Sequence, residues 1–260
     1  MKIAIIGYGK MGHMIEDVAR SRGHEIVARI DVGDAFDLKD ADVAIEFTTP
    51  ATAKDNILRA WAQGVPVVCG STGWIENLSP TLSSREGELG GRKGEWKIEE
   101  SSNKVIVKDE TGKVMLVWSS NYSVGVNIFF ELNMFLAEQM KNLTPTLSSR
   151  EGEKSEGYTP SIKEIHHIHK LDKPSGTAKT LAEQISAMYE GRMHDVRMEV
   201  PIESIREGEV PGTHEVTWDS EEDTIVITHI AKGRRGFALG AVLAAEKLAL
   251  SPDDVILTTH

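Results

Sequence analysis

The stretch KIAIIGYGKMGHMIEDVARSRGHEIVARID, residues 2–31, decides the fold class. It begins with a short apolar run, Ile3 to Ile6, which is typical of a buried parallel strand. A G-x-G-x-x-G motif and an amphipathic helical pattern follow, and a second strand from His24 to Ile30 ends at Asp31. Strand, glycines, helix, strand and acid in this order predict a Rossmann-like unit that binds a dinucleotide.

Each glycine of the motif has a physical task. Gly7 permits a tight turn, Gly9 lets a pyrophosphate approach the backbone, and Gly12 lets helix and strand pack closely. The helix N-terminus then faces the phosphates. A carboxylate at Asp31 favours NADH over NADPH, because it accepts hydrogen bonds from ribose hydroxyls and repels a 2′-phosphate, although the neighbouring Arg29 weakens this preference. The alternatives are a chance glycine turn and a Rossmann-like domain that binds no nucleotide.

The rest of the chain predicts further strands and helices and then a second domain. Strands are expected at 42–47, 65–69, 114–118 and 162–170, and helices at 51–63, 126–140, 175–189 and 235–250. Period-two alternation from 196 to 231 indicates antiparallel strands. The core stripe of helix 126–140 is expected to consist of Ile128, Phe129, Leu132, Phe135 and Leu136. The predicted fold class is α/β, with a Rossmann-like doubly wound parallel sheet and a second, mixed-sheet α+β domain.

Composition is that of an ordinary globular protein. The chain has 260 residues, 40% of them apolar and 27% charged, and a net charge of −11 from 40 acidic and 29 basic residues. No basic stripe is present, so nucleic-acid binding is not expected. The single cysteine, Cys69, excludes an internal disulfide and fits a reducing cytosol. No apolar run is long enough for a membrane span, and the N-terminal run is too short for a signal peptide.

Two loops follow expected parallel strands and should therefore lie at the ligand-binding edge of the sheet. They are Thr48–Pro50 (TTP) and Gly70–Gly73 (GSTG), and both lie where a nicotinamide could bind, although plain turn chemistry explains each equally well. Cys69 directly precedes the second loop and could be a nucleophile. A small buried hydrophobic residue is the favoured interpretation, because the local sequence places no His or Asn partner beside it.

The segment EIHHIHKLDKPSGTAK, residues 164–179, combines three histidines, a lysine and a helix start. In a strand, His166 and His167 would point to opposite faces and His167 and His169 to the same face. A metal site is a minor possibility, because no cysteine accompanies the histidines and HHxH matches no standard ligand spacing. We interpret His169 as a structural residue, whose hydrogen bonds are satisfied within the fold.

Proton transfer suits the rest of this segment better. Histidine titrates near neutral pH and can act as a general acid, and Lys170 offers a second proton donor and a cation for an anionic substrate. Ser175 is a natural N-cap, and Gly176 allows close approach of a ligand. The exposed N–H groups of the helix start and the Thr177 hydroxyl would hold a carboxylate.

Six blocks resemble the 4-hydroxy-tetrahydrodipicolinate reductase family, also called the dihydrodipicolinate reductase family, of lysine and diaminopimelate biosynthesis. They occur in family order, and the similarity around them covers most of the chain. The blocks are GYGKMG, EFTTP, CGSTGW, SSNYSVGVN, RRGFALGA and, most specific, the pattern E-x-H-H-x-x-K-x-D-x-P-S-G-T-A at Glu164 to Ala178. The resemblance implies that NADH, the expected preference, or NADPH reduces an unsaturated cyclic imine dicarboxylate to tetrahydrodipicolinate. It also implies a homotetramer. Together with the single cysteine and the histidine spacing, this leads us to expect a cytoplasmic homotetramer without a metal.

The resemblance assigns roles residue by residue. His166 would donate the proton with Lys170 assisting, and His167, Lys170, Ser175, Gly176 and Thr177 would hold the substrate carboxylates. The cofactor contacts would be Gly7, Tyr8, Gly9, Lys10, Met11, Gly12, Asp31, Phe47, Thr48, Gly70, Ser71, Thr72, Ser119, Ser120, Asn121 and Tyr122. The dinucleotide-binding domain would span 1–123 and be completed by a C-terminal helix within 233–260, and 124–232 would bind substrate and form the oligomer.

The chain departs from the family between Gly73 and Val114, where it is longer than expected and lacks the pattern of a crossover helix. Residues 94–113 look like a hairpin with Thr111 and Gly112 at a turn. NLSPTLSSREGE at 77–88 recurs as NLTPTLSSREGE at 142–153, which suggests two surface insertions or, alternatively, a paired docking epitope.

Two other functions are compatible with the sequence. One is an aldehyde dehydrogenase of semialdehyde type with Cys69 as its nucleophile, which alone would require a free thiol at that position. The other is a nucleotide-sensing protein without catalysis, which would have no need of the proton donors at His166 and Lys170.

Overall fold

The computed structural model describes residues 1–75, 96–101, 104–141, 143, 157–189 and 198–250. The chain divides into two compact units, Met1–Val124 with Arg234–His260, and Gly125–Gly233. The boundaries expected from the sequence lie one residue away from these. Apart from Leu143, both copies of the repeat lie outside the described residues. Among the helices described here, none is both long and apolar enough to cross a membrane.

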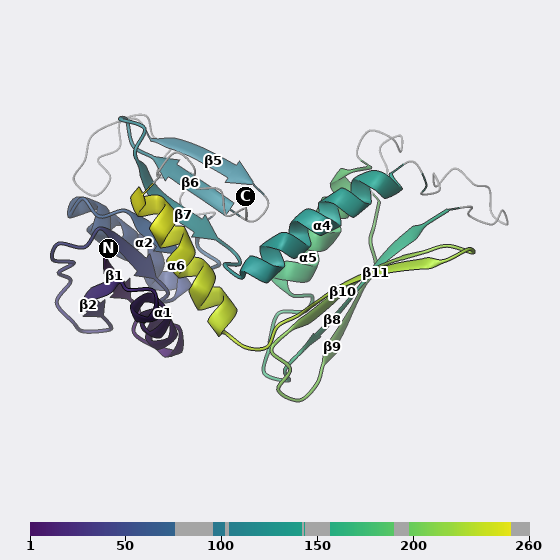
Figure 1. Ribbon diagram of the computed structural model, residues 1–260, viewed down its shortest axis with the longest axis horizontal. Helices are drawn as coiled ribbons and strands as arrows, with labels where there is room; N and C mark the ends of the chain where they lie inside the picture. The colour runs from purple at the N-terminus through teal and green to yellow at the C-terminus, as the bar shows by residue number, and fades with distance from the viewer. Residues whose placement is uncertain (76–95, 102–103, 142, 144–156, 190–197, 251–260) are drawn as a thin grey trace. The chain divides into compact units, whose positions relative to one another are not determined.

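The first unit contains a seven-stranded sheet in the order β2-β1-β3-β4-β7-β6-β5 (Figure 1). Its strands are β1 (Lys2–Ile6), β2 (Glu25–Ile30), β3 (Val43–Glu46), β4 (Val67–Cys69), β5 (Lys97–Ser101), β6 (Lys104–Lys108) and β7 (Val114–Ser119). The first five strands of the sheet order, which are β2, β1, β3, β4 and β7, pair in parallel. The structure thus confirms the Rossmann-like sheet, whose strands are nearly continuous apolar runs because both faces are covered.

Helices cover the two faces of this sheet. On one face, α1 (Lys10–Ser21) and α6 (Arg235–Leu250) share a core cluster with β1 and β3, and α6 also contacts β4 and β7. On the other face, α2 (Pro50–Ala62) packs through Ile57 and Trp61. The fit of α6 is tight at Gly240, because a Cβ there would lie 1.5 Å from the backbone oxygen of Tyr122.

The extra segment before β7 extends the sheet with antiparallel strands. β6 pairs with β7 and β5 pairs with β6. Gly112, with φ +86°, donates its amide to the Asp109 carbonyl at 2.9 Å and closes the turn between β6 and β7. The hairpin expected at Thr111 and Gly112 is therefore confirmed. Trp96 stacks on Trp61 of α2 at 4.7 Å, so the segment joins the core.

The second unit contains a four-stranded sheet in the order β11-β10-β8-β9. Its strands are β8 (Thr159–His166), β9 (Ile202–Arg206), β10 (Thr213–Asp219) and β11 (Thr224–Ile230), and its helices are α4 (Val124–Met140) and α5 (Gly176–Ala187). Residues of both helices form one buried cluster with Ile162 of β8 and with Val216 and Trp218 of β10. Figure 1 shows α4 and α5 running side by side.

Two sequence expectations for this unit are partly wrong. The mixed sheet is confirmed, and β10 pairs antiparallel with β8 and β11 as expected. β9, however, pairs parallel to β8, because alternation identifies a half-buried strand but not its direction, and the connection through α5 is a crossover. Of the core stripe expected in α4, Phe129 is buried and Leu136 packs against the core cluster, but Ile128, Leu132 and Phe135 are exposed. The buried face consists of Val126, Phe129, Phe130, Asn133, Ala137 and Met140. Apolar residues surround most of this helix, so periodicity alone did not select the buried face.

Candidate functional site

His166 is the last residue of β8, and the strand does not continue to Lys170 as the sequence suggested. Its neighbour β9 ends at Arg206, and pairing with β10 stops at Ile165, so no ladder is available beyond this point. The chain then turns, and the Lys170 amide donates to the His167 carbonyl at 3.2 Å. The alternation of faces assumed for His167 and His169 therefore does not apply.

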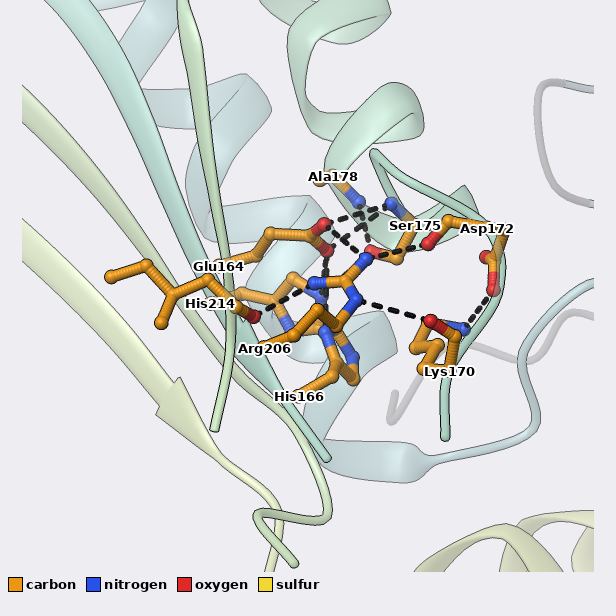
Figure 2. Close-up of polar contacts among 9 residues, drawn as sticks. Glu164, His166, Lys170, Asp172, Ser175, Ala178, Arg206 and His214 are labelled. Atoms are coloured by element: carbon orange, nitrogen blue, oxygen red, sulfur yellow. Dashed lines mark hydrogen bonds and ion pairs between the residues drawn. The ribbon is translucent and has the colours of Figure 1, made fainter. Parts of the chain in front are cut away.

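Four buried side chains from different elements meet at this strand end (Figure 2). Glu164 and His166 come from β8, His214 from β10, and Ser175 from the start of α5. The Nδ1 of His166 lies 3.3 Å from the Oε2 of Glu164, and the Nε2 of His214 lies 3.7 Å from the same oxygen. The two imidazoles contact edge to face at 4.9 Å, and the Ser175 hydroxyl lies 3.1 Å from the Nε2 of His214.

The Glu164 carboxylate is the electrostatic centre of this group. It is fully buried and accepts hydrogen bonds from the Ser175 amide at 3.0 Å and from the Nη2 of Arg206 at 3.1 Å. Burial opposes its ionisation, but the hydrogen bonds from Ser175 and Arg206 outweigh burial and hold the pKa of Glu164 at about 2. A full negative charge therefore faces both imidazoles at neutral pH.

Both histidines of the cluster are neutral at pH 7. Burial lowers the pKa of His214 to about 4, and the nearby His166 adds to this effect. Burial also lowers the pKa of His166, while the charge of Glu164 opposes that shift. The Nδ1 of His166 makes no hydrogen bond within the described residues, although the carboxylate is 3.3 Å away, so Glu164 acts on it mainly through its charge.

Arg206 joins the cluster to the loop that carries Lys170. Its Nε donates to the Lys170 carbonyl at 3.3 Å, and its Nη2 donates to the Asp172 carbonyl at 2.5 Å. The Nζ of Lys170 pairs with the Asp172 carboxylate at 2.8 Å (Figure 2). The side chain of Lys170 is 25% exposed, and its charge acts on His166.

The start of α5 has the features expected of an anion-binding site. The Ser175 hydroxyl accepts the Ala178 amide at 3.3 Å, which confirms the N-cap. No atom of the described residues lies within 4 Å of a Cβ placed at Gly176, so the backbone there is open to a ligand. Thr177 follows in the first turn and is half-buried.

The other two histidines of the segment differ from each other. His167 is half-buried, and its amide donates to the Val210 carbonyl at 2.8 Å. His169 is exposed, and its Nε2 lies 3.2 Å from the Oε1 of Glu209, so it lies outside the strand in which the sequence placed it. The histidine at the centre of the cluster, besides His166, is His214.

Glu164, His166 and His214 are also close enough to hold a metal ion, since their ligand atoms lie within 4.8 Å of one another. The carboxylate, however, already accepts hydrogen bonds from Ser175 and from the guanidinium of Arg206. A fixed positive charge at 3.1 Å disfavours a second cation at this carboxylate. The proton-transfer hypothesis therefore remains the preferred one.

In the first unit, the glycine loop fits a dinucleotide phosphate. Gly7 has φ +93°, and a Cβ placed there would lie 2.3 Å from the Phe47 carbonyl oxygen. A Cβ placed at Gly12 would lie 2.4 Å from the Gly7 carbonyl oxygen. Around Gly9 no described atom lies within 4 Å of such a Cβ, and no described side chain caps the start of α1. Space beside Gly9 together with a helix start that has no described side-chain cap is the arrangement that a phosphate site uses.

The other expected cofactor loops meet at the same edge of the sheet. Glu46, fully buried at the end of β3, accepts hydrogen bonds from the amide and hydroxyl of Thr48. The Thr48 amide also donates to the Ser71 hydroxyl at 2.9 Å. The hydroxyl of Tyr122 donates to the Cys69 carbonyl at 3.0 Å, which ties the third loop to the second.

Cys69 is the small buried residue that the sequence favoured. Its side chain is fully buried, and its Sγ donates to the Oε2 of Glu46 at 2.9 Å. Burial raises the pKa of the Cys69 thiol well above its ordinary value, and the charge of Glu46 adds to this. A neutral, buried thiol is inert, so the structure gives no support to the semialdehyde dehydrogenase interpretation.

Asp31 lies at the end of β2, as expected, and is exposed. Its amide donates to the Oδ2 of Asp34 at 2.8 Å, and the Val32 amide donates to the Oδ1 of Asp31 at 2.9 Å. Arg29, which appeared to oppose the effect of Asp31, pairs instead with Glu16 of α1.

The sequence pattern indicates no role for Arg206, His214 or Glu46, and Glu164 stands in it without a role. Only Glu164 carried a usable local signal, as the first residue of the E-x-H-H pattern. His214 is opposite Glu164 in the pairing of β10 with β8, and Arg206 is opposite His166 in the pairing of β9 with β8. Their roles depend on sheet register between distant segments.

Comparison with known proteins agrees with this geometry. The family models for the N-terminus and the C-terminus of dihydrodipicolinate reductase match residues 1–90 and 125–259. The 4-hydroxy-tetrahydrodipicolinate reductase of Christiangramia forsetii is 41% identical in an alignment of 256 positions that covers 95% of this chain and 92% of that protein. The same enzyme of Archaeoglobus fulgidus is 30% identical in an alignment of 282 positions, gaps included, that covers 96% of this chain and 94% of that protein.

A solved structure shares the fold. The dihydrodipicolinate reductase from Paenisporosarcina sp. TG-14, solved with dipicolinate bound, has a TM-score of 0.66 over 96% of this chain and 94% of its own, at 18% identity. Two family models over most of the length, together with a relative at 41% identity, establish the relationship expected from the motifs. The chain belongs to the dihydrodipicolinate reductase family, whose members are NAD(P)H-dependent oxidoreductases.

Proposed function

We propose that this chain is a 4-hydroxy-tetrahydrodipicolinate reductase, which uses a nicotinamide cofactor to reduce a cyclic imine dicarboxylate to tetrahydrodipicolinate in diaminopimelate and lysine biosynthesis. The observation that carries the proposal is the buried group around His166, with an ionised Glu164 beside it and an open, capped helix start at Ser175 and Gly176. A family relative with dipicolinate bound supports a planar dicarboxylate as the ligand class.

The first unit would hold the cofactor, which supplies a hydride when bound. The uncapped start of α1 and the loop from Gly7 to Gly12 would hold the pyrophosphate. Asp31 would hold the adenosine ribose. The loops after β3, β4 and β7 would line the nicotinamide site, through Phe47 and Thr48, Gly70 to Thr72, and Ser119 to Tyr122. Glu46 and Tyr122 hold these loops together by hydrogen bonds.

The second unit would bind the substrate and supply the proton. Lys170, His167 and the start of α5, with Ser175, Gly176 and Thr177, would hold the carboxylates, because a cation and the positive end of a helix favour an anion. His166 would donate the proton that balances hydride addition, with Lys170 assisting. The negative charge of Glu164 makes protonation of His166 easier than burial alone would allow.

Three finer properties belong to the same proposal. NADH is the preferred cofactor, because Asp31 repels a 2′-phosphate. The protein is a homotetramer, which exposed apolar side chains such as Val226 and Ile230 on β11 support. It is cytoplasmic, which the single cysteine supports. Molar mass in solution and cell fractionation test the last two points.

The first test is substrate-dependent oxidation of NADH, followed by nicotinamide absorbance. The substrate is generated in place from pyruvate and aspartate semialdehyde by a dihydrodipicolinate synthase, and the assay is repeated with NADPH. We expect oxidation with both cofactors. His166→Gln should reduce kcat by about 10²- to 10⁴-fold, because it removes a general acid, while NADH still binds.

Two outcomes would contradict the proposal. Turnover that is unchanged in His166→Gln would remove the proton-donor role. The nucleotide-sensing alternative would be favoured if folded wild-type protein binds NADH but does not oxidise it when substrate is supplied. A Cys69→Ser variant with normal turnover would add to the case against the thiol-dependent alternative.

A further inference from the structure

An acidic residue of α1 holds Arg29, which lies two residues before Asp31. Arg29 donates from Nε to the Oε2 of Glu16 at 2.7 Å and from Nη2 to its Oε1. The two bonds form a bidentate fork, which is the geometry arginine also uses for phosphate. Glu16 is largely buried although it is charged, so its partners are needed to keep it in place.

Further contacts hold the fork in position. The hydroxyl of Tyr8, from the glycine loop itself, donates to the Oε2 of Glu16 at 2.5 Å, and the guanidinium of Arg29 lies 5.7 Å from the centre of the Tyr8 ring. Arg20 donates from Nε to the Oε1 of Glu16 at 2.6 Å from the exposed side. Hydrogen bonds from Arg29 lower the pKa of Glu16 far below its ordinary value, so the pair is fully charged.

The position of Arg29 makes this arrangement relevant to cofactor choice. It lies two residues before Asp31 on the strand that ends at the expected ribose site, and both positions are exposed. In Rossmann domains that use NADPH, an arginine in this neighbourhood binds the 2′-phosphate. Here the guanidinium is already satisfied by a carboxylate, and that carboxylate adds a second negative charge to that of Asp31.

We propose that Glu16 is a specificity-determining residue, which withholds Arg29 from the 2′-phosphate of NADPH and thereby makes the first unit prefer NADH. The inference rests on the proposed function, because it assumes that the glycine loop binds a nicotinamide dinucleotide. It concerns the binding of the cofactor alone, so its test does not depend on substrate or on turnover.

The test measures dissociation constants for NADH and NADPH by titration calorimetry at fixed ionic strength, in four forms of the full chain. These are the wild type, Glu16→Gln, Arg29→Ala and the double variant. In Glu16→Gln the released guanidinium should improve binding of NADPH relative to NADH about tenfold, the size of one charge-assisted hydrogen bond. The double variant should lose this gain, and Arg29→Ala alone should leave the ratio close to that of the wild type.

Several outcomes would overturn the inference. An unchanged ratio in Glu16→Gln would show that Arg29 does not reach the phosphate when released. Selective loss of NADPH binding in Arg29→Ala alone would show that Glu16 does not withhold the guanidinium. If NADH still binds normally to Glu16→Gln and to Arg29→Ala, either of these outcomes contradicts only this inference. A wild-type protein that binds neither NADH nor NADPH would contradict the proposed function as well.

A second variant keeps the test valid if Glu16→Gln does not fold. Glu16→Asp retains the charge but shortens the side chain, so it cannot keep the full fork with Arg29. We expect a smaller shift toward NADPH in the same direction, with thermal unfolding as the control for folding. No shift in a folded Glu16→Asp would overturn the inference.

Discussion

Glu16 in the first unit and Glu164 in the second are both acids held by an arginine, but they differ in burial. The Glu16 side chain is 11% exposed and that of its partner Arg29 is 35% exposed. The Glu164 side chain has no exposure, and that of Arg206 has 14%. Glu16 has two arginines and a tyrosine hydroxyl as partners, whereas Glu164 has one arginine, an amide and two neutral imidazoles nearby.

The difference shows how burial changes the effect of an ion pair. Near the surface, water screens the charges, so the Glu16 pair mainly fixes where one arginine points. In the interior, the charge of Glu164 is poorly screened, so it also changes the proton affinity of His166. The same two residue types therefore can control ligand choice in one unit and proton transfer in the other.

The largest expected effect comes from removing the two arginines in turn. Arg206→Ala leaves Glu164 charged and buried without its cation, so we expect a loss of about 3–5 kcal/mol in the free energy of unfolding. Arg29→Ala should cost only about 1 kcal/mol or less, because its pair is partly exposed and Glu16 keeps Tyr8 and Arg20. Urea unfolding of both variants at pH 7 measures the contrast. Equal losses would show that burial does not distinguish the two pairs.

The next effect is a pH dependence of stability from His214. Its pKa of about 4 in the folded protein is below the 6.5 of an unperturbed histidine, so the unfolded chain binds the proton more tightly. The stabilisation is complete above pH 6.5 and is lost as the pH falls from 6.5 to 4. The difference corresponds to about 3 kcal/mol. Unfolding free energies measured across this window should decline, and more steeply in the wild type than in His214→Gln.

Glu164 contributes in a different window, which allows the two groups to be separated. Its pKa of about 2 is lower than the ordinary 4.5, so its stabilisation is present above pH 4.5 and is lost as the pH falls toward 2. A His214→Gln variant whose stability between pH 6.5 and 4 falls as steeply as that of the wild type would assign the slope to other groups, such as His166 or His229.

A smaller effect should appear in the pH profile of catalysis. Glu164→Gln removes the charge that opposes the effect of burial on His166, so the pKa of His166 should fall further. A general acid loses activity as the pH rises through its pKa, so the alkaline limb of kcat/KM should move to lower pH by about one unit. If the rate falls but the alkaline limb of the kcat/KM profile stays at the same pH, Glu164 has a purely structural role.

The features that sequence alone predicted are those specified by adjacent residues. The glycine loop, α1 and the acid after β2 form one continuous stretch, and the N-cap at Ser175 needs only its own turn. The hairpin at Thr111 and Gly112 is similarly local. Each of these depends on backbone geometry within a few residues, which amino-acid type controls directly.

The features that sequence did not predict depend on register and packing over long separations. His214 comes beside Glu164 only because β10 pairs with β8 in one register, 50 residues apart. The end of β8 at His166 depends on where its neighbouring strands end. The buried face of α4 is selected by the sheet it packs on, and Glu16 finds Arg29 only when α1 lies on β2.

The smallest expected effect is at Arg20, the exposed partner of Glu16. Its side chain is 56% exposed and pairs with Glu16 one helical turn away, so Arg20→Ala should cost about 0.3–0.5 kcal/mol in unfolding free energy. It should also leave the ratio of NADH to NADPH affinity unchanged, since the fork to Arg29 remains. A shift in that ratio as large as that of Glu16→Gln would mean that the net charge near the loop sets the preference, and that the orientation of Arg29 does not.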